Sequence, residues 1–280
     1  MKYIIILSKE VKKNDILGED INNPLIIDNN DDITITKHIN TSLELSSFEE
    51  ELRNNIIRHH IENGIYIENP KTTIIGPKVI IMDNTKIYQG SRILGDTLIS
   101  KDTIIGPNSN IIDSFIDEGS SIINSQITNS KIGKNTKVGP FANIRMDSVI
   151  GDNDRIGNYV EIKKSKIGNN TNASHLAYIG DTLCGNNVNF GCGSITVNYD
   201  GKNKHQTKIG NNVFIGCNSN LIAPITIGNG SYIAAQTTLT RSLNEFDFAI
   251  SRNTELIKNG YSLKYHKEDD LKWNTLGQME

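Results

Sequence analysis

Aliphatic residues recur every six positions along most of this chain. The spacing holds in three runs, separated by a stretch of five- and six-residue steps and by a longer interruption. The runs are Ile75, Ile81, Ile87, Ile93, Ile99, Ile105 and Ile111; Ile132, Val138, Ile144, Ile150, Ile156 and Ile162; and Ile209, Ile215, Leu221, Ile227, Ile233 and Leu239. A short internal period of this kind indicates a repeat architecture.

The six-residue period predicts strands rather than helices. Six residues at about 100° each would rotate successive isoleucines onto different faces of a helix. Strand side chains alternate with a period of two, so every sixth residue points to the same side. Glycines directly after aliphatic residues, as at Gly133, Gly151 and Gly210, suit tight corners between short strands. Three such sides would form a coil of about 18 residues, and stacked coils would pair in parallel. We therefore predict a mainly β protein with a parallel β-helix over residues 71–252.

An antiparallel β-sandwich with regular turns is the alternative fold. It does not explain one strict six-residue phase across three long runs, so we favour the β-helix. Residues 1–70 are expected to form an N-terminal segment of unknown role that ends in a helix, and residues 1 to about 45 lack the repeat. Residues 3–7 predict a strand, and residues 47–63 predict a helix with Ser47 as its N-cap and acidic residues in its first turn. Residues 253–280 are expected to form a polar tail.

Composition and charge exclude several classes of protein. A formal net charge of −3 provides no basic field for nucleic acid. No apolar run approaches the ~18 residues of a membrane span, and the N-terminal apolar run lacks a signal cleavage site. The cysteines, Cys184, Cys192 and Cys217, are odd in number and lack CxxC spacing, which indicates reduced thiols. We expect a cytoplasmic protein that binds neither nucleic acid nor membrane.

Two cations are spaced by one predicted coil. Arg145 and Lys163 each follow a ladder isoleucine, and they should stack one coil above the other with their side chains outward. Like charges so placed repel each other unless an anion lies between them. Lys164 and Lys166 extend this positive patch, and Glu161 lies beside it. The pattern fits a phosphate clamp and equally fits a solvated basic face.

The six-residue spacing fails between residues 167 and 209. This interval contains His175 and Tyr178 in the string SHLAYIGD, then Asn189, and then an excursion, VNYDGKNKHQTK, longer than one repeat. Insertions in repeat proteins often carry function. A lone histidine is more often structural, however, so the pattern alone leaves the role of His175 open.

Six strings in this part of the chain resemble a known family. They are VGPFANIR, GNYVEIKKSKIG, ASHLAYIGD, VNFGCGSITVNYDGKNKHQT, VFIGCNSNLIAP and FAISR. From about Ile56 to Arg252, the sequence resembles the C-terminal acetyltransferase domain of the bifunctional N-acetylglucosamine-1-phosphate uridylyltransferase/glucosamine-1-phosphate N-acetyltransferase family. The resemblance implies a left-handed β-helix that forms a homotrimer with sites between subunits. It implies N-acetylation of an amino-sugar phosphate, glucosamine 1-phosphate, with acetyl-CoA as co-substrate and no metal for this step.

The resemblance also assigns roles to residues. His175 resembles the general base, since an imidazole can accept a proton near neutral pH. The residues that resemble the sugar-phosphate site are Arg145, Lys163, Tyr178, Asn189 and Glu161. Those that resemble acetyl-CoA contacts are Asn198, Tyr199, Lys204, Cys217, Ala235 and Arg252.

Departures from the family keep other functions open. Cys217 replaces the usual serine near the acetyl group, and Gln236 replaces a glycine. Residues 1–45 have no assigned role and are too few for a uridylyltransferase domain, so we expect no uridylyltransferase activity. Another amino sugar or nucleotide sugar as acceptor, and a catalytically silent scaffold, are the alternatives. A metal hydratase of this fold needs several histidines on the coils, but five of the six lie elsewhere: His38, His59, His60, His205 and His266.

Overall fold

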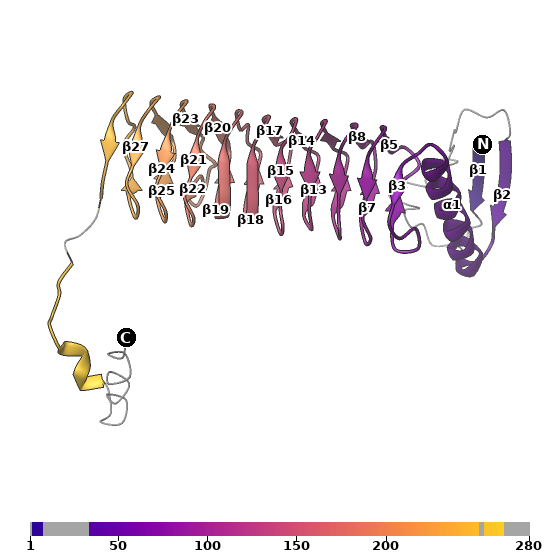
Figure 1. Cartoon of the computed structure of the whole chain (residues 1–280), viewed down its shortest axis with the longest axis horizontal. Coiled ribbons are helices and arrows are strands. Elements are labelled where there is room, and N and C mark those ends of the chain that lie inside the picture. Colours follow the sequence, from indigo (N-terminus) through magenta and orange to yellow (C-terminus); the bar gives the residue numbers. More distant parts are fainter. Residues whose placement is uncertain (1, 8–33, 252–254, 266–280) are drawn as a thin grey trace, which may run out of the picture.

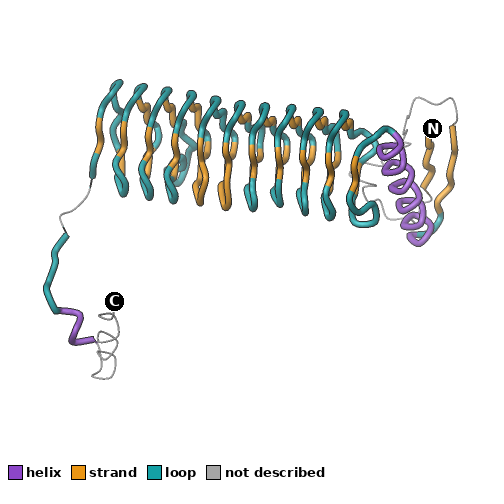
Figure 2. The backbone as a smooth tube through the Cα atoms, viewed as in Figure 1, coloured by secondary structure: helices purple, strands orange, loops and turns teal. Residues whose placement is uncertain are grey.

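The computed structural model describes residues 2–7, 34–251 and 255–265 and shows a long β-helix with an α-helix at one end (Figure 1). Short strands alternate with corner loops along its whole length (Figure 2). The strands of successive coils pair in parallel and in register, for example Ile93 with Ile111 and Ile144 with Ile162. The predicted parallel β-helix is therefore confirmed.

The strands lie on three sides of the solenoid. The first side contains β3 (Tyr66–Ile67), β6 (Lys86–Ile87), β9 (Ile104–Ile105), β12 (Ser121–Ile122), β15 (Lys137–Val138), β21 (Asn189–Phe190), β24 (Phe214–Ile215), β27 (Tyr232–Ile233) and β29 (Phe248–Ala249). The second contains β4 (Ile74–Ile75), β7 (Arg92–Leu94), β10 (Asn110–Ile112), β13 (Gln126–Thr128), β16 (Asn143–Arg145), β22 (Ile195–Val197), β25 (Asn220–Ile222) and β28 (Thr238–Leu239). The third contains β5 (Ile80–Ile81), β8 (Leu98–Ile99), β11 (Phe115–Ile116), β14 (Lys131–Ile132), β17 (Val149–Ile150), β20 (Thr182–Cys184), β23 (Thr207–Ile209) and β26 (Ile225–Ile227).

Two longer strands run across the corner between the first and second sides. β18 (Arg155–Lys163) pairs with β15 at its start and with β16 at its end. β19 (Asn172–Gly180) pairs with β18 along nearly its whole length, beginning with Asn172 opposite Arg155. These two strands carry His175 and most of the residues predicted to bind the sugar phosphate.

The aliphatic ladders fill the interior of the solenoid. Every member of the three six-residue runs is buried except Ile81, which is half-buried in the first coil. Coil winding continues where the spacing of the sequence fails, because Ala173, Phe190 and Thr196 take inward positions. The excursion lengthens the coil that carries it, yet Ile195 still pairs with Asn220 on the next coil and the stack is uninterrupted.

A second, polar layer lies inside the corners. Serine or threonine occurs two positions before most inward residues, and several of these hydroxyls bond to the backbone of a neighbouring coil. Thr136, for example, donates from Oγ1 to the carbonyl of Gly151 (2.8 Å) and accepts from the N–H of Asp154 (3.0 Å). Asp154 occupies one of these hydroxyl positions, and burial raises the pKa of its carboxyl to about 7.

The α-helix closes the N-terminal end of the solenoid. It spans Ser42–Glu62 (α1) and packs against β4 through a buried face formed by Leu45, Phe48, Leu52, Ile56, Ile57 and His60. The prediction of Ser47 as N-cap is wrong. Thr41 is the N-cap: its Oγ1 accepts from the N–H of Glu44, and Glu44 in turn accepts from the N–H of Asn40. The described residues include no helix able to cross a membrane.

A two-stranded sheet and a C-terminal segment lie outside the solenoid. β1 (Lys2–Leu7) pairs in parallel with β2 (Thr34–Ile39), which confirms the strand predicted over residues 3–7. Beyond the last coil, residues 255–265 extend away from the solenoid and end in a 3₁₀ helix, η1 (Tyr261–Tyr265) (Figure 1).

Candidate active site

His175 lies on the corner that β18 and β19 cross. Its register partner on the coil below is Asn158, and its Nδ1 lies 2.8 Å from Asn158 Oδ1. The backbones approach closely here: a Cβ at Gly157 would collide with the carbonyl oxygen of Ser174. The imidazole is exposed, so it can reach a bound substrate.

The same corner column continues toward the C-terminus. β19 pairs in register with β21, β21 with β24, and β24 with β27. This register aligns His175 with Cys192, Cys217 and Ala235 on successive coils. Backbone hydrogen bonds in the next residues of each coil hold this alignment. Two of the residues predicted to contact acetyl-CoA, Cys217 and Ala235, therefore share one edge of the solenoid with the predicted base.

The two stacked cations lie on the second side, next to this corner. Arg145 and Lys163 are register partners, as their spacing of one coil predicts. Glu161 accepts from Arg145 Nε at 3.0 Å and from Nη2 at 2.6 Å. The repulsion expected between the cations is thus offset by a carboxylate from the chain itself, at least for Arg145.

A nearly buried network surrounds Lys163. Its Nζ lies 3.9 Å from Asp181 Oδ2, with 14% of the lysine side chain and 12% of the aspartate side chain exposed. Asp181 also accepts from Asn198 Nδ2, which lies 3.4 Å from the hydroxyl of Tyr178. A Cβ at Gly180 would collide with that hydroxyl, so this glycine gives the tyrosine its space. The network joins the predicted sugar-phosphate residues to the start of the excursion.

The excursion is a small preorganised hairpin. Tyr199 and Lys204 form an antiparallel bridge, and Lys204 Nζ lies 4.4 Å from the centre of the Tyr199 ring. Asp200 closes the turn by accepting from the backbone N–H of Asn203 and from His205 Nε2 at 2.7 Å. These hydrogen bonds, with one from the backbone of Lys202, hold the pKa of Asp200 well below its usual range.

The structure does not bring every predicted residue into this group. Asn189 lies on β21, on the first side, whereas Tyr178 lies on the second. Arg252 falls outside the described residues. Sequence reasoning missed Asp181 and Asn158, although both lie inside strings quoted for the resemblance. The coil between β18 and β19 is one residue shorter than the regular repeat, and this shorter spacing pairs Asn158 with His175.

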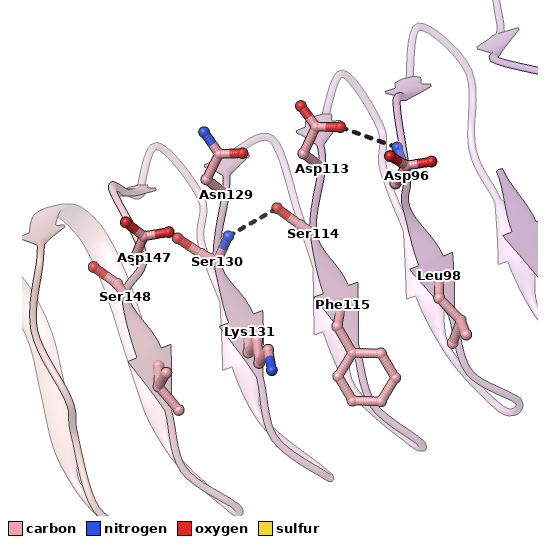
Figure 3. A pocket seen from close by; sticks show the side chains of 11 residues that line it. Asp96, Leu98, Asp113, Ser114, Phe115, Asn129, Ser130, Lys131, Asp147 and Ser148 are labelled. Atoms are coloured by element: carbon pink, nitrogen blue, oxygen red, sulfur yellow. Dashed lines mark hydrogen bonds between the residues drawn. The ribbon is translucent and has the colours of Figure 1, made fainter. Parts of the chain in front are cut away.

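A separate cavity of about 370 Å³ lies on the third side, along β8, β11, β14 and β17 (Figure 3). None of the predicted site residues lines it. Its polar groups bond to one another between coils, as Asp113 does with the N–H of Asp96 (3.0 Å) and Ser114 with the N–H of Ser130 (3.2 Å). Within the described ranges, no cluster of three metal-ligating side chains occurs.

The repeats define a class of protein, and two family models match parts of the chain. Residues 206–241 match the family model "Bacterial transferase hexapeptide (six repeats)", so the chain is a hexapeptide-repeat protein of the left-handed β-helix type. Residues 104–192 match the model "GlmU-like, C-terminal hexapeptide". Over these residues the chain resembles the GlmU-like C-terminal hexapeptide domain.

Curated relatives agree with that assignment. The chain is 48% identical over 228 residues to bifunctional protein GlmU of Clostridium novyi (strain NT), covering 81% of this chain and 50% of the relative. It is 49% identical over 223 residues to bifunctional protein GlmU of Geobacillus sp. (strain WCH70), covering 80% and 49%. The chain spans about half the length of these relatives. A solved structure of UDP-N-acetylglucosamine acyltransferase from Francisella novicida matches with a TM-score of 0.43, 15% identity and 61% coverage of each chain.

Proposed function

We propose that this chain transfers the acetyl group of acetyl-CoA to the amine of glucosamine 1-phosphate in the cytoplasm. One observation carries the proposal: an exposed imidazole lies on the corner that leads into the side with two stacked cations, within a segment that matches the GlmU-like C-terminal hexapeptide. A base and an anion site at one edge suit a substrate that carries both an amine and a phosphate. The proposal covers acetyl transfer alone.

The chemistry needs one proton acceptor and no covalent acyl-enzyme. The amine nitrogen of the sugar attacks the thioester carbonyl carbon, and His175 Nε2 takes the proton that the amine loses. The carbonyl then re-forms, the C–S bond breaks, and CoA leaves as a thiolate that takes up a proton. Arg145, Lys163 and Tyr178 bind the sugar's phosphate, and Glu161 and Asn189 bind its amine and hydroxyls. No metal is assigned to this step.

The acyl donor would lie along the corner column and the excursion. Cys217 and Ala235 lie in line with His175, so a thioester along this edge would present its carbonyl to the imidazole. Asn198, Tyr199 and Lys204 on the preorganised hairpin would bind the rest of acetyl-CoA, and Lys204 would face its phosphates. Arg252 completes the proposed acetyl-CoA contacts. We also propose a homotrimer in which a second copy lines each site.

A second acceptor class is favoured by one specific observation. Glu161 already accepts two hydrogen bonds from Arg145, and Asp181 lies beside the ammonium of Lys163. A substrate phosphate would have to compete with both carboxylates. An amino sugar or nucleotide sugar that lacks a phosphate at this position avoids that competition, and it is the second candidate.

Release of free CoA, followed with a thiol reagent, tests the proposal across glucosamine 1-phosphate, glucosamine 6-phosphate and glucosamine. We expect turnover with the 1-phosphate, and a decrease of about 10²- to 10⁴-fold in His175→Ala. His59→Ala, on α1, is the matched control and should keep full turnover. Equal rates with all three acceptors would favour the second candidate. Failure of acetyl-CoA to bind in calorimetry would favour a silent scaffold.

A further inference from the structure

We propose that Asn158 is a positioning residue that fixes the tautomer of His175, an inference that rests on the proposed acetyl transfer. The imidazole and the amide are register partners on neighbouring coils, and His175 Nδ1 lies 2.8 Å from Asn158 Oδ1. An amide oxygen has lone pairs and no hydrogen, so it can only accept. The hydrogen bond therefore requires the proton on Nδ1 and leaves a lone pair on Nε2.

This choice of tautomer matters for a general base. A histidine side chain in water favours the proton on Nε2, where it would block the nitrogen that points outward. A hydrogen bond to one ring nitrogen decides which of the two carries the proton. With Nδ1–H donated to Asn158, Nε2 is the nitrogen available to take a proton from the sugar's amine.

The fold builds this contact through a close approach of two coils. Gly157 allows it, because any side chain there would meet the carbonyl oxygen of Ser174. The residues that follow the pair, Tyr159 and Leu176, have φ values of 57° and 36°, in the left-handed region that bulky side chains avoid. The equivalent position on other coils is also left-handed, at Asn124, Phe141, Gly193, Asn218 and Gln236, so this conformation belongs to the corner itself.

Asn158, the hydrogen-bond partner of His175, is a neutral amide and not a carboxylate. A carboxylate bonded to Nδ1–H would favour the imidazolium, which cannot accept another proton. The other ionisable groups of these strands are Arg155, Tyr159, Glu161 and Lys163 on β18 and Tyr178 on β19, with Cys192 on the next coil. Glu161 bonds to Arg145, and Lys163 lies beside Asp181. The amide therefore orients the imidazole without adding charge next to it.

Kinetics of two variants test the assignment. Asn158→Ala removes the acceptor, so kcat should fall about 10- to 100-fold while KM for the sugar changes little. Asn158→Asp keeps an acceptor at Nδ1, so kcat should recover at high pH. Its carboxylate should also move the acid limb of the kcat/KM profile up by about one pH unit or more. Asn172→Asp, on the same strand as His175, is the matched charge control and should leave the limb in place.

Nitrogen-15 NMR of the His175 ring provides a readout that needs no activity. The wild-type chain should show a protonated Nδ1 and an unprotonated Nε2, and Asn158→Ala should move the proton toward Nε2. The same tautomer in both proteins, or an acid limb that does not move in Asn158→Asp, would overturn the inference. If the tautomer depends on Asn158 but no acceptor is acetylated, then the proposed function fails while the positioning role stands.

Discussion

Replacing Asp154 with threonine should stabilise the β-helix above neutral pH. Asp154 is 2% exposed and occupies a position where the neighbouring coils carry Thr136 and Thr171. Its Oδ1 accepts from the N–H of Thr171 at 2.7 Å. Its Oδ2 is buried without a hydrogen-bond partner in the described structure. A threonine hydroxyl could accept the same N–H, as Thr136 does one coil below, and would carry no charge.

The size of the effect follows from the pKa of this carboxyl. Burial raises it from an ordinary value of 3.8 to about 7, and about three pH units at 1.36 kcal/mol each correspond to about 4 kcal/mol. The unfolded chain loses this proton near pH 4, whereas the folded chain keeps it until about pH 7. Stability is therefore lost as the pH rises through that interval, and the full penalty is present by about pH 8.

Urea unfolding at pH 5 and at pH 8 measures this penalty. The wild-type free energy of unfolding should fall between the two conditions by a few kcal/mol more than that of Asp154→Thr. Asp147→Asn, which changes an exposed carboxylate on the preceding coil, should follow the wild type. If Asp154→Thr and the wild type lose stability in parallel, Asp154 is not a buried neutral acid and the reasoning is wrong.

Three further predictions concern thiols, a strained corner and a buried histidine. N-ethylmaleimide should modify the exposed Cys192 and Cys217 but spare Cys184, because burial raises the pKa of the Cys184 thiol. Acetyl-CoA should protect Cys217 from labelling, which mass spectrometry of the labelled peptides measures. Equal labelling with and without acetyl-CoA would exclude a thioester near Cys217. Leu176→Asn should raise the free energy of unfolding by about 1 kcal/mol, because asparagine tolerates φ near 36° better than leucine does; unchanged urea midpoints would contradict this. Burial lowers the pKa of His60 to about 4, so the stability contributed by its neutral imidazole is lost as the pH falls from 6.5 through 4. The thermal unfolding temperature of His60→Phe should therefore depend less on pH in that range than that of the wild type. An unchanged pH dependence would contradict this prediction.

The coils could be predicted from sequence because burial repeats with the backbone. Strand side chains alternate, so an isoleucine at every sixth position had to share one interior, and the regular coil length correctly stacked Arg145 on Lys163. The coil between β18 and β19 is one position shorter than the regular repeat, and the backbones approach closely at Gly157. Because the spacing argument used the regular coil length, it did not predict the contact between Asn158 and His175.

The electrostatic partners could not be predicted from spacing alone. Asp181 reaches Lys163 from the start of the third side, across a corner whose geometry no period in the sequence specifies. The start of α1 is a different case. Thr41 and Glu44 carry a capping signal in the sequence, but the acidic residues after Ser47 offered a second start that fitted equally well.

Product analysis tests the central claim most directly. Incubating the chain with carbonyl-labelled acetyl-CoA and glucosamine 1-phosphate should yield a sugar phosphate that gains the mass of one labelled acetyl group on nitrogen. His175→Ala should yield almost none of this product under the same conditions. Unchanged sugar phosphate with the wild-type chain, or equal product from His175→Ala, would contradict the account.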